Sequence, residues 1–436
     1  MVVAKLVTYI YQKKLKPYLT NMNLKRKNEI YNIDGLPVNE LAKKFGTPCF
    51  IYSESCIAKN FKAIHDIFNS DKKKVYYSVK ANSNLSILKL LHNLGSGFDI
   101  VSMGELERVI KVGVDPKNIV YSGVGKSESD IKKSIELGIY CINVESFSEL
   151  ERIEKIASEL KVKAPVAIRV NPNIDPKSHE YISTGLESTK FGINLKNTMD
   201  AFLYADKKEF INLIGIDYHI GSQIETLEPF IEAIDSVSKI LKELEDKNIN
   251  LELIDMGGGL GIDYEGNKVP TMEEYGEAIN KSIKDNGLEN YKIILELGRS
   301  IVGNAGYLLT KVEYIKEDSK KNYVIVDAGM DNLIRPALYN AWHSIISTGT
   351  HNEKEILCDV VGPVCECADF LGKERMLSVK QDDILVISSC GAYASSMSSN
   401  YNSRPRPAEV IIKNKEAKLI IKKEKIQDLL SREIII

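Results

Sequence analysis

The feature that most constrains the fold is a regular alternation of short β-type runs with amphipathic helical stretches. Three of the helical stretches open with a serine, which caps helix N-termini well, and these span Ser102–Val112, Ser127–Leu137 and Ser146–Leu160. Eight strand-helix units over about 225 residues predict a (β/α)8 barrel, which typically takes about 250, whereas a doubly wound sheet would hold fewer strands. The eight runs are Val75–Val79, Phe98–Ile100, Ile119–Tyr121, Tyr140–Val144, Pro165–Val170, Ile214–Tyr218, Leu253–Met256 and Ile293–Leu295.

After Arg299 the pattern changes, because helical periodicity fades and strand-like segments follow one another. We read these segments as antiparallel strands of a second, β-rich domain of sandwich or barrel type. They are Lys311–Ile315, Tyr323–Asp327, Ile356–Val361, Ile384–Ser388, Glu409–Ile412 and Ala417–Ile421. The predicted organisation is a basic N-terminal extension over residues 1–26, a lead-in over 27–48 that partly joins the β-rich domain, the barrel over 49–302 and the β-rich domain over 303–436. Within the lead-in we expect a strand in Lys27–Val38 and a short helix over Asn39–Phe45.

Composition excludes several classes of function. A formal net charge of -2 over 436 residues gives no electrostatic reason to expect nucleic acid or a membrane surface as a partner. The seven cysteines are odd in number and scattered, which favours a reducing, cytoplasmic setting over a disulfide framework. Cys365 and Cys367 stand too close together for the usual zinc pattern, so we predict no structural metal. The expected partners are small molecules.

The first segment differs from the rest because every charged side chain from Met1 to Lys27 is basic. Apolar residues lie among these charges, which is compatible with a basic amphipathic helix or with a poorly ordered extension. The segment has no compact apolar region followed by a small-residue cleavage site, so it does not resemble a secretory signal. Met22 is an alternative start.

Polar side chains fall where the predicted barrel strands end, which is the face on which barrel enzymes build their active sites. Lys80 ends the first run. It is either a solvated strand end or a partly desolvated amine of lowered pKa, able to form a Schiff base with a carbonyl. The other groups at these ends are Asp99, His219, Gly257, Gly258, Gly259 and Glu296.

A phosphate site is expected opposite Lys80. The glycine loop follows the seventh run, and Gly298 with Arg299 follows the eighth, where barrels commonly bind a phosphate through exposed backbone N–H groups. A phosphate site facing a reactive lysine suggests pyridoxal phosphate, which also needs a charge partner for its pyridine nitrogen. Glu296 is suited to be that partner, and His219 to lie flat against the ring.

The motifs strongly resemble the diaminopimelate decarboxylase family, in the alanine-racemase-like, fold-type III class of pyridoxal-phosphate enzymes. The similarity runs from about Gly35 to Pro407 and excludes the basic extension. It rests on YYSVKANSN, GFDIVSMGEL, HIGSQI, GGGLGIDY, ELGRS, RPALYNAWHSI, GPVCECADF and GAYASSMSSNYNSRPRPAEV. The resemblance implies decarboxylation of meso-2,6-diaminopimelate to L-lysine and carbon dioxide, the last step of lysine biosynthesis.

The resemblance also implies roles for individual residues. Lys80, His219, Glu296 and Cys365 would be catalytic, with Lys80 holding the cofactor and Cys365 donating a proton. Cys365 and Glu366 would reach in from the partner subunit of a homodimer. The implied cofactor site comprises Lys80, Asp99, His219, Ser222, Gly258, Gly259, Glu296, Leu297, Gly298, Arg299 and Tyr393. The implied substrate contacts are Arg299, Arg335, Tyr339, Glu366 and Tyr393, with Arg335 and Tyr339 at the distal carboxylate and Glu366 at the distal ammonium.

One departure and three alternatives remain open. The family more often has Cys-Glu-Ser where this chain has Cys-Glu-Cys, so Cys367 offers oxidants a second thiol. An ornithine-, arginine- or carboxynorspermidine-type decarboxylase would keep the fold and change the substrate. An amino-acid racemase is a further alternative. That class places an arginine at the pyridine nitrogen, whereas this chain has the carboxylate of Glu296. A non-catalytic pyridoxal-phosphate-binding protein would resemble the barrel alone.

Overall fold

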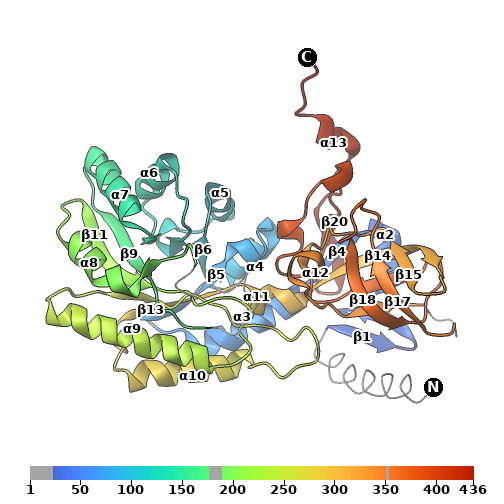
Figure 1. The fold of residues 1–436 in the computed structure, drawn as a ribbon, viewed down its shortest axis with the longest axis horizontal. Coiled ribbons are helices and arrows are strands. Elements are labelled where there is room, and N and C mark those ends of the chain that lie inside the picture. Colours follow the sequence, from blue (N-terminus) through green and yellow to red (C-terminus); the bar gives the residue numbers. More distant parts are fainter. Residues whose placement is uncertain (1–22, 176–188, 350–352) are drawn as a thin grey trace. The chain divides into compact units, whose positions relative to one another are not determined.

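The computed structural model describes residues 23–175, 189–349 and 353–436, and these divide into two compact units (Figure 1). The barrel unit contains Ala58–Ile262 and Val269–Ile301. The β-rich unit contains the described residues up to Ile57, Asp263–Lys268 and the described residues from Val302 to Ile436. The predicted basic extension lies outside the described residues, apart from residues 23–26.

The barrel unit is a closed ring of eight parallel strands, as predicted. Around the ring, each strand pairs with its two neighbours, and the ring closes because β13 pairs with β5 and β8 pairs with β9. Every predicted run coincides with a strand to within a few residues. The strands are β5 (Lys73–Ser78), β6 (Gly97–Ile100), β7 (Ile119–Tyr121), β8 (Cys141–Val144), β9 (Ala164–Asn171), β11 (Ile211–Asp217), β12 (Leu253–Asp255) and β13 (Lys292–Leu297). A short ninth strand, β10 (Ile193–Asn194), pairs with β9 outside the ring.

Helices alternate with these strands, and the three predicted serine caps are confirmed. The hydroxyl oxygens of Ser102, Ser127 and Ser146 accept N–H groups three residues later, at 3.3, 3.2 and 3.2 Å. In the described part of the chain, no helix is both long and apolar enough to cross a membrane. The helices are α3 (Glu54–Phe68), α4 (Leu85–Asn93), α5 (Met103–Lys111), α6 (Glu128–Leu137), α7 (Phe147–Leu160), α8 (Leu195–Asp206), α9 (Glu228–Asp246), α10 (Met272–Asp285) and α11 (Arg299–Val302).

The barrel interior is a packed core and not a channel. Tyr76 and Leu253 belong to a buried apolar cluster contributed by β5, β7, β8, β9, β12 and β13. Gly97 in β6 is required by this packing, because a Cβ atom there would lie 2.6 Å from the Tyr76 ring. Since side chains fill the interior, groups that do chemistry are expected at the strand ends and in the loops that follow them.

The β-rich unit is built on a nine-stranded mixed sheet, which corrects the prediction of antiparallel strands alone. Strand β15 pairs in parallel with β17, and β4 pairs in parallel with β20. The strands are β4 (Cys49–Ser53), β14 (Gly306–Lys316), β15 (Asn322–Val326), β16 (Ile345–Ser347), β17 (Ile356–Val361), β18 (Phe370–Leu377), β19 (Ile384–Ile387), β20 (Ala408–Lys413) and β21 (Glu416–Ile421). The connection between β15 and β17 is long enough for the chain to return in the same direction, which parallel pairing requires. Two short helices, α12 (Arg335–Tyr339) and α13 (Ile426–Leu430), complete the unit.

The lead-in segment forms a small three-stranded sheet and a helix. The region predicted as one strand contains β2 (Ile30–Ile33) and β3 (Leu36–Pro37), with β1 (Leu24–Lys27) before them, and the predicted short helix is α2 (Val38–Phe45). Strand β4 follows, and it pairs with β14 and β20 in the large sheet, although the predicted barrel segment begins at residue 49. The lead-in and the large sheet share one apolar core, which consists of Leu24, Ile33, Val38, Leu41, Ala42, Cys49, Ile51, Tyr307, Leu309, Val386, Ala408, Val410 and Ile412.

This shared core generates a stability prediction. Ile51→Ala in β4 removes a fully buried side chain, and we expect it to lower the free energy of unfolding by about 2–5 kcal/mol. Leu419→Ala in β21 is the control, because that side chain is 47% exposed and its loss should cost no more than about 0.5 kcal/mol. Urea unfolding followed by circular dichroism compares the two, and equal losses would contradict the proposed packing.

Candidate active site

Lys80 lies at the mouth of the barrel. Strand β5 ends at Ser78, and the 3-10 turn η1 (Val79–Ala81) carries Lys80 past the strand end. The ammonium nitrogen of Lys80 donates a short hydrogen bond to Oδ2 of Asp99, in the neighbouring strand β6. The Asp99 side chain is fully buried, whereas the Lys80 side chain is 33% exposed. Lys80 is therefore a partly buried amine held by a buried carboxylate, not a solvated strand end.

The turn that carries Lys80 is fixed from both sides. The hydroxyl of Ser78 donates to the backbone carbonyl of Glu296 at 3.1 Å, which joins β5 to β13 beyond their ladder. Gly298 packs against the turn so closely that a Cβ atom there would lie 3.0 Å from the Ala81 Cβ. The hydroxyl of Tyr77 donates to the Asn82 carbonyl at 2.9 Å. These contacts fix the path of the backbone on either side of Lys80.

His219 and the glycine loop form the next part of the site. The N–H of Gly258 donates to Nδ1 of His219 at 3.2 Å, so a neutral His219 ring carries its proton on Nε2. Burial lowers the pKa of His219 well below its ordinary value, and the positive charges of Arg169 and Lys80 lower it further. The imidazole is thus neutral. A neutral ring can lie against another aromatic ring without placing a second cation beside Lys80.

Glycine is obligatory in this loop. A Cβ atom on Gly258 would lie 1.8 Å from the carbonyl oxygen of Glu296. Gly259 has a φ of +121°, and a Cβ atom there would lie 2.3 Å from the Gly221 carbonyl oxygen. The backbone therefore approaches its neighbours as only glycine allows, and the N–H groups of Gly257 and Gly258 donate to Asp255 and to His219.

The loops after β11, β12 and β13 are tied together. The guanidinium of Arg299, which begins α11, donates to Oγ of Ser222 at 3.0 Å and is buried. The Gln223 amide bridges to the backbone of Ile262 with hydrogen bonds of 2.6 and 3.2 Å. Arg299, Ser222 and the glycine loop thus occur on one set of connected loops, in the position predicted for a phosphate.

Buried carboxyl groups converge near Lys80. Burial and the negative charges of Asp255 and Asp99 raise the pKa of Glu296 well above its ordinary value, although Lys80 opposes the shift. Burial raises the pKa of Asp255 to about 6. Burial and Asp255 raise the pKa of Asp217 well above its ordinary value. Among the described residues, Oε1 of Glu296 is buried without a hydrogen-bond partner. Glu296 is therefore a buried carboxyl group with a raised pKa and with one oxygen left for a ligand.

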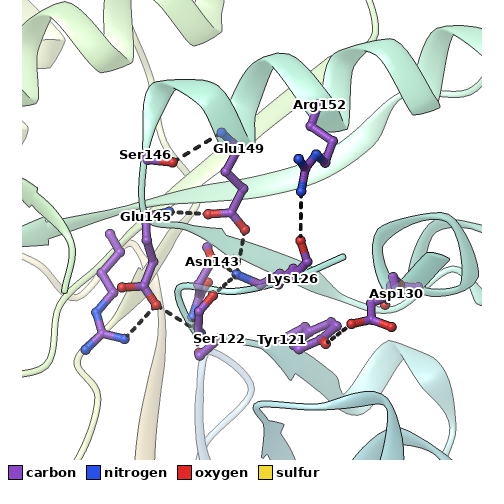
Figure 2. Close-up of polar contacts among 12 residues, drawn as sticks. Tyr121, Ser122, Lys126, Asp130, Asn143, Glu145, Ser146, Glu149 and Arg152 are labelled. Carbon is purple, nitrogen blue, oxygen red and sulfur yellow. Dashed lines mark hydrogen bonds and ion pairs between the residues drawn. The ribbon is translucent and has the colours of Figure 1, made fainter. Parts of the chain in front are cut away.

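A network beside this cluster is built on a buried lysine (Figure 2). The ammonium of Lys126 donates to Oε1 of Glu149 at 2.8 Å and to the backbone carbonyls of Gly123 and Asn143, both at 2.7 Å. The other carboxylate oxygen of Glu149 accepts the N–H of Glu145 at 2.7 Å. Lys126 thereby joins the loops that follow β7 and β8.

Glu145 extends this network to Arg169. Its carboxylate accepts the N–H groups of Gly123 and Gly192 at 2.9 and 3.0 Å. The same carboxylate accepts Nη1 of Arg169 at 3.2 Å. Arg169 also forms an ion pair of 3.7 Å with Asp217. The network therefore places one buried guanidinium among the carboxyl groups of the barrel mouth.

The sequence analysis missed Lys126, Glu145, Arg169, Asp217 and Asp255. A signal existed for three of them, because Arg169, Asp217 and Asp255 are charged residues inside otherwise apolar strands. A charge in such a strand is tolerated only where it is paired or functional. Lys126 and Glu145 lie in loops and carried no comparable signal.

The remaining predicted site residues belong to the β-rich unit. Arg335 is buried at the start of α12, and Tyr339 ends that helix. Tyr393 follows β19, is partly buried and has a positive φ of 54°. The structure thus brings Lys80, Asp99, His219, Ser222, Gly258, Gly259, Glu296, Leu297, Gly298 and Arg299 together in the barrel unit, and it places Arg335, Tyr339, Cys365, Glu366 and Tyr393 in the other unit.

The loop that carries Cys365 is shaped by a buried aspartate. The carboxylate of Asp369 accepts the N–H groups of Met330 and Val364, both at 2.6 Å. The N–H of Cys365 donates to the Asn402 side chain at 2.8 Å. Cys365 and Cys367 have free thiols and are both exposed. The Glu366 side chain between them is exposed as well. Within the described ranges, no group of three or more His, Cys, Asp or Glu residues could hold a metal ion.

The Lys126 network yields a prediction. Lys126→Met leaves Glu149 buried without its cation, and removing one partner of a buried pair typically costs about 3–5 kcal/mol. Lys133→Met is the matched control, because the Lys133–Glu107 pair is exposed and should contribute less than about 1 kcal/mol. Thermal and urea unfolding measure both variants. A stability of Lys126→Met equal to that of the control would show that the network is not a buried charge pair.

Comparisons with known proteins agree with this geometry. Residues 54–303 match the family model for the pyridoxal-binding domain of pyridoxal-dependent decarboxylases. The chain is 45% identical over 399 residues to the diaminopimelate decarboxylase of Neisseria meningitidis serogroup B, covering 92% of this chain and 96% of that protein. It is 43% identical over 414 residues to the corresponding protein of Aquifex aeolicus, covering 94% and 96%.

Solved structures give the same result. A diaminopimelate decarboxylase from Helicobacter pylori, complexed with L-lysine, superposes with a TM-score of 0.86 at 43% identity, covering 90% of this chain and 98% of that one. A diaminopimelate decarboxylase from M. jannaschii has a TM-score of 0.89 at 40% identity, covering 95% and 98%. The similarity thus includes both units and not the barrel alone. The chain belongs to the pyridoxal-dependent decarboxylases and, among them, to the diaminopimelate decarboxylase family.

Proposed function

We propose that this protein removes the carboxylate from the D-configured carbon of meso-2,6-diaminopimelate, giving L-lysine and carbon dioxide as the last step of lysine biosynthesis. The observation that carries the proposal is the pairing of Lys80 with the buried Asp99 at the mouth of a barrel, beside a buried Glu296 whose pKa is raised. The relatives named above are diaminopimelate decarboxylases, and one of their structures contains L-lysine, the product that this reaction would release.

The residues of the barrel unit fit pyridoxal phosphate. The amine of Lys80 is suited to bind the aldehyde carbon, and Asp99 holds that amine. Ser222 and Arg299 offer hydroxyl and guanidinium donors of the kind that bind phosphate, and the glycine loop allows a close approach of the backbone. Oε1 of Glu296, which has no hydrogen-bond partner among the described residues, is suited to the pyridine nitrogen.

In this mechanism, the bound cofactor supplies a sink for the electron pair that remains on the α-carbon when carbon dioxide departs. Glu296, whose pKa is raised by burial, would face the ring nitrogen, and its carboxyl group would keep that nitrogen protonated. His219 is neutral and would stack on the ring. The thiol of Cys365 would return a proton to the α-carbon after decarboxylation.

We further propose that the distal end of the substrate is recognised by paired charges. Arg335, with Tyr339, would bind the distal carboxylate, and Glu366 would bind the distal ammonium. By family resemblance, Cys365 and Glu366 would come from the partner subunit of a cytoplasmic homodimer, and Tyr393 would contact phosphate and substrate. A related decarboxylase specific for ornithine or arginine is the second candidate, but such substrates lack the distal carboxylate that Arg335 would bind.

Lys80 provides the first test of this proposal. Lys80→Ala should lose the visible absorbance of the covalently held cofactor and nearly all carbon dioxide release, because the anchor and a proton-transfer group are removed together. In the parent protein, borohydride reduction followed by peptide mapping should locate the cofactor on Lys80. Lys133→Ala on α6 is the control and should keep both signals. Cofactor attachment at another lysine would contradict the assignment.

The same assay tests substrate identity. Carbon dioxide should be released from meso-diaminopimelate at a rate that exceeds release from L-ornithine or L-arginine, because only the first substrate satisfies both Arg335 and Glu366. Faster release from L-ornithine would support the second candidate and refute the first.

A shared active site gives a complementation prediction. Mixing the inactive variants Lys80→Ala and Cys365→Ala under conditions of subunit exchange should rebuild one intact site in each mixed dimer. With random exchange, half of the dimers are mixed, so activity should recover to about one quarter of the parent value. Exchange is verified with differently tagged subunits. Confirmed exchange without recovered activity would mean that each site is built within one chain.

A further inference from the structure

Two residues that the proposed mechanism does not use surround Arg335 in the β-rich unit. The ε nitrogen of His343 lies 2.8 Å from Nη1 of Arg335. The Arg335 guanidinium carbon also lies 4.5 Å from the centroid of the Tyr264 ring, within the range of a cation–π contact. Arg335 is itself only 4% exposed. His343 comes from the RPALYNAWHSI motif and Tyr264 from GGGLGIDY, and neither residue received a role from the sequence.

The tautomer of His343 is set by its second hydrogen bond. Its Nδ1 atom lies 2.8 Å from the backbone carbonyl oxygen of Ser388, which follows β19. A carbonyl only accepts, so Nδ1 carries the proton and Nε2 presents a lone pair to Arg335. His343 is fully buried, and a protonated ring would have no lone pair for the guanidinium. The contact therefore requires the neutral imidazole.

Tyr264 packs against the guanidinium of Arg335. The guanidinium carbon lies over the Tyr264 ring, and this ring meets the His343 ring edge to face, with centroids 5.2 Å apart and planes at 74°. An aromatic ring beside the cation adds a cation–π attraction and limits its movement. Arg335 thus contacts both an aromatic ring and an imidazole.

The groups that make these two contacts are uncharged. A carboxylate in the place of His343 would offset the positive charge of Arg335 and occupy its bidentate fork. His343 instead accepts one N–H group without adding a negative charge. Neutral supports of this kind suit a cation that must bind a carboxylate.

From this arrangement we infer that His343 and Tyr264 are positioning residues that orient Arg335 for the distal carboxylate of the substrate and so set specificity for a dicarboxylic diamino acid. The inference rests on the proposed role of Arg335. Loss of His343 or Tyr264 leaves the charge of Arg335 in place but allows its guanidinium to change orientation. Affinity for the substrate should therefore fall while the chemical step at the other end proceeds.

The test compares His343→Leu with His343→Gln in the holoenzyme. Leucine removes the acceptor, and we expect KM for meso-diaminopimelate to rise about 10- to 100-fold, the effect of losing a hydrogen bond to a charged group, with kcat within about threefold of the parent. Glutamine keeps an acceptor oxygen near the position of Nε2 and should restore most of the affinity. Tyr264→Phe should resemble the parent, whereas Tyr264→Leu should raise KM.

A double-mutant cycle separates positioning from general structural damage. If His343 acts through Arg335, then His343→Leu should raise KM no further in an Arg335→Ala background. Additive effects in the double variant, or a fall in kcat at unchanged KM in His343→Leu, would overturn the inference. Circular dichroism and thermal unfolding confirm that each variant is folded.

A measurement without substrate distinguishes failure of this inference from failure of the proposed function. Nitrogen-15 NMR of the imidazole in the cofactor-free protein should show His343 as the neutral Nδ1–H tautomer, with an Nε2 shift that changes in Arg335→Lys. An unaffected shift would refute the His343–Arg335 contact, whatever the substrate. A changed shift together with no decarboxylation of diaminopimelate would retain the contact and reject the substrate.

Discussion

An excess of buried carboxyl groups at the mouth of the barrel governs the chemistry of this protein. Asp99, Asp217, Asp255 and Glu296 end or follow apolar stretches of neighbouring strands, and the charges of Lys80 and Arg169 lie among them. Burial and repulsion together raise the pKa of Glu296, because ionising it would place one more negative charge in a crowded, poorly solvated site. A protonated carboxyl group at this position would be able to transfer its proton to a ring nitrogen, and the charged ring would then compensate the carboxylate.

Much of the surrounding structure serves to hold this arrangement in place. Gly258 lets the backbone approach Glu296 and hydrogen bond to His219. The Lys126 network positions Glu145, which in turn holds Arg169 (Figure 2). In the β-rich unit the charged group has neutral neighbours instead, because Arg335 is contacted by the rings of His343 and Tyr264. Each site thus combines a charged group with supports that define its protonation state and direction.

The sequence predicted what depends on local pattern. Eight β-type runs and serine caps identified the barrel, and the strand ends located Lys80, His219, the glycine loop and Glu296. It did not predict what depends on tertiary pairing. The sequence of one strand does not identify its parallel partner, so the pairing of β4 with β20 was missed. Strand β18 was missed because the charges of Lys373–Arg375 break the alternation of apolar and polar residues. Asp217 and Asp255 carried a local signal as charges in apolar strands, but their shared surroundings arise only when the ring closes.

The most direct test of this account is the protonation state of Glu296. Infrared difference spectroscopy on adding pyridoxal phosphate to the cofactor-free protein detects loss of a protonated carboxyl C=O band, and Glu296→Gln assigns that band. We expect a band from a protonated Glu296 before addition and its disappearance afterwards, as the proton passes to the ring nitrogen. An ionised Glu296 in the cofactor-free protein, or a band that survives cofactor binding, would contradict the central claim.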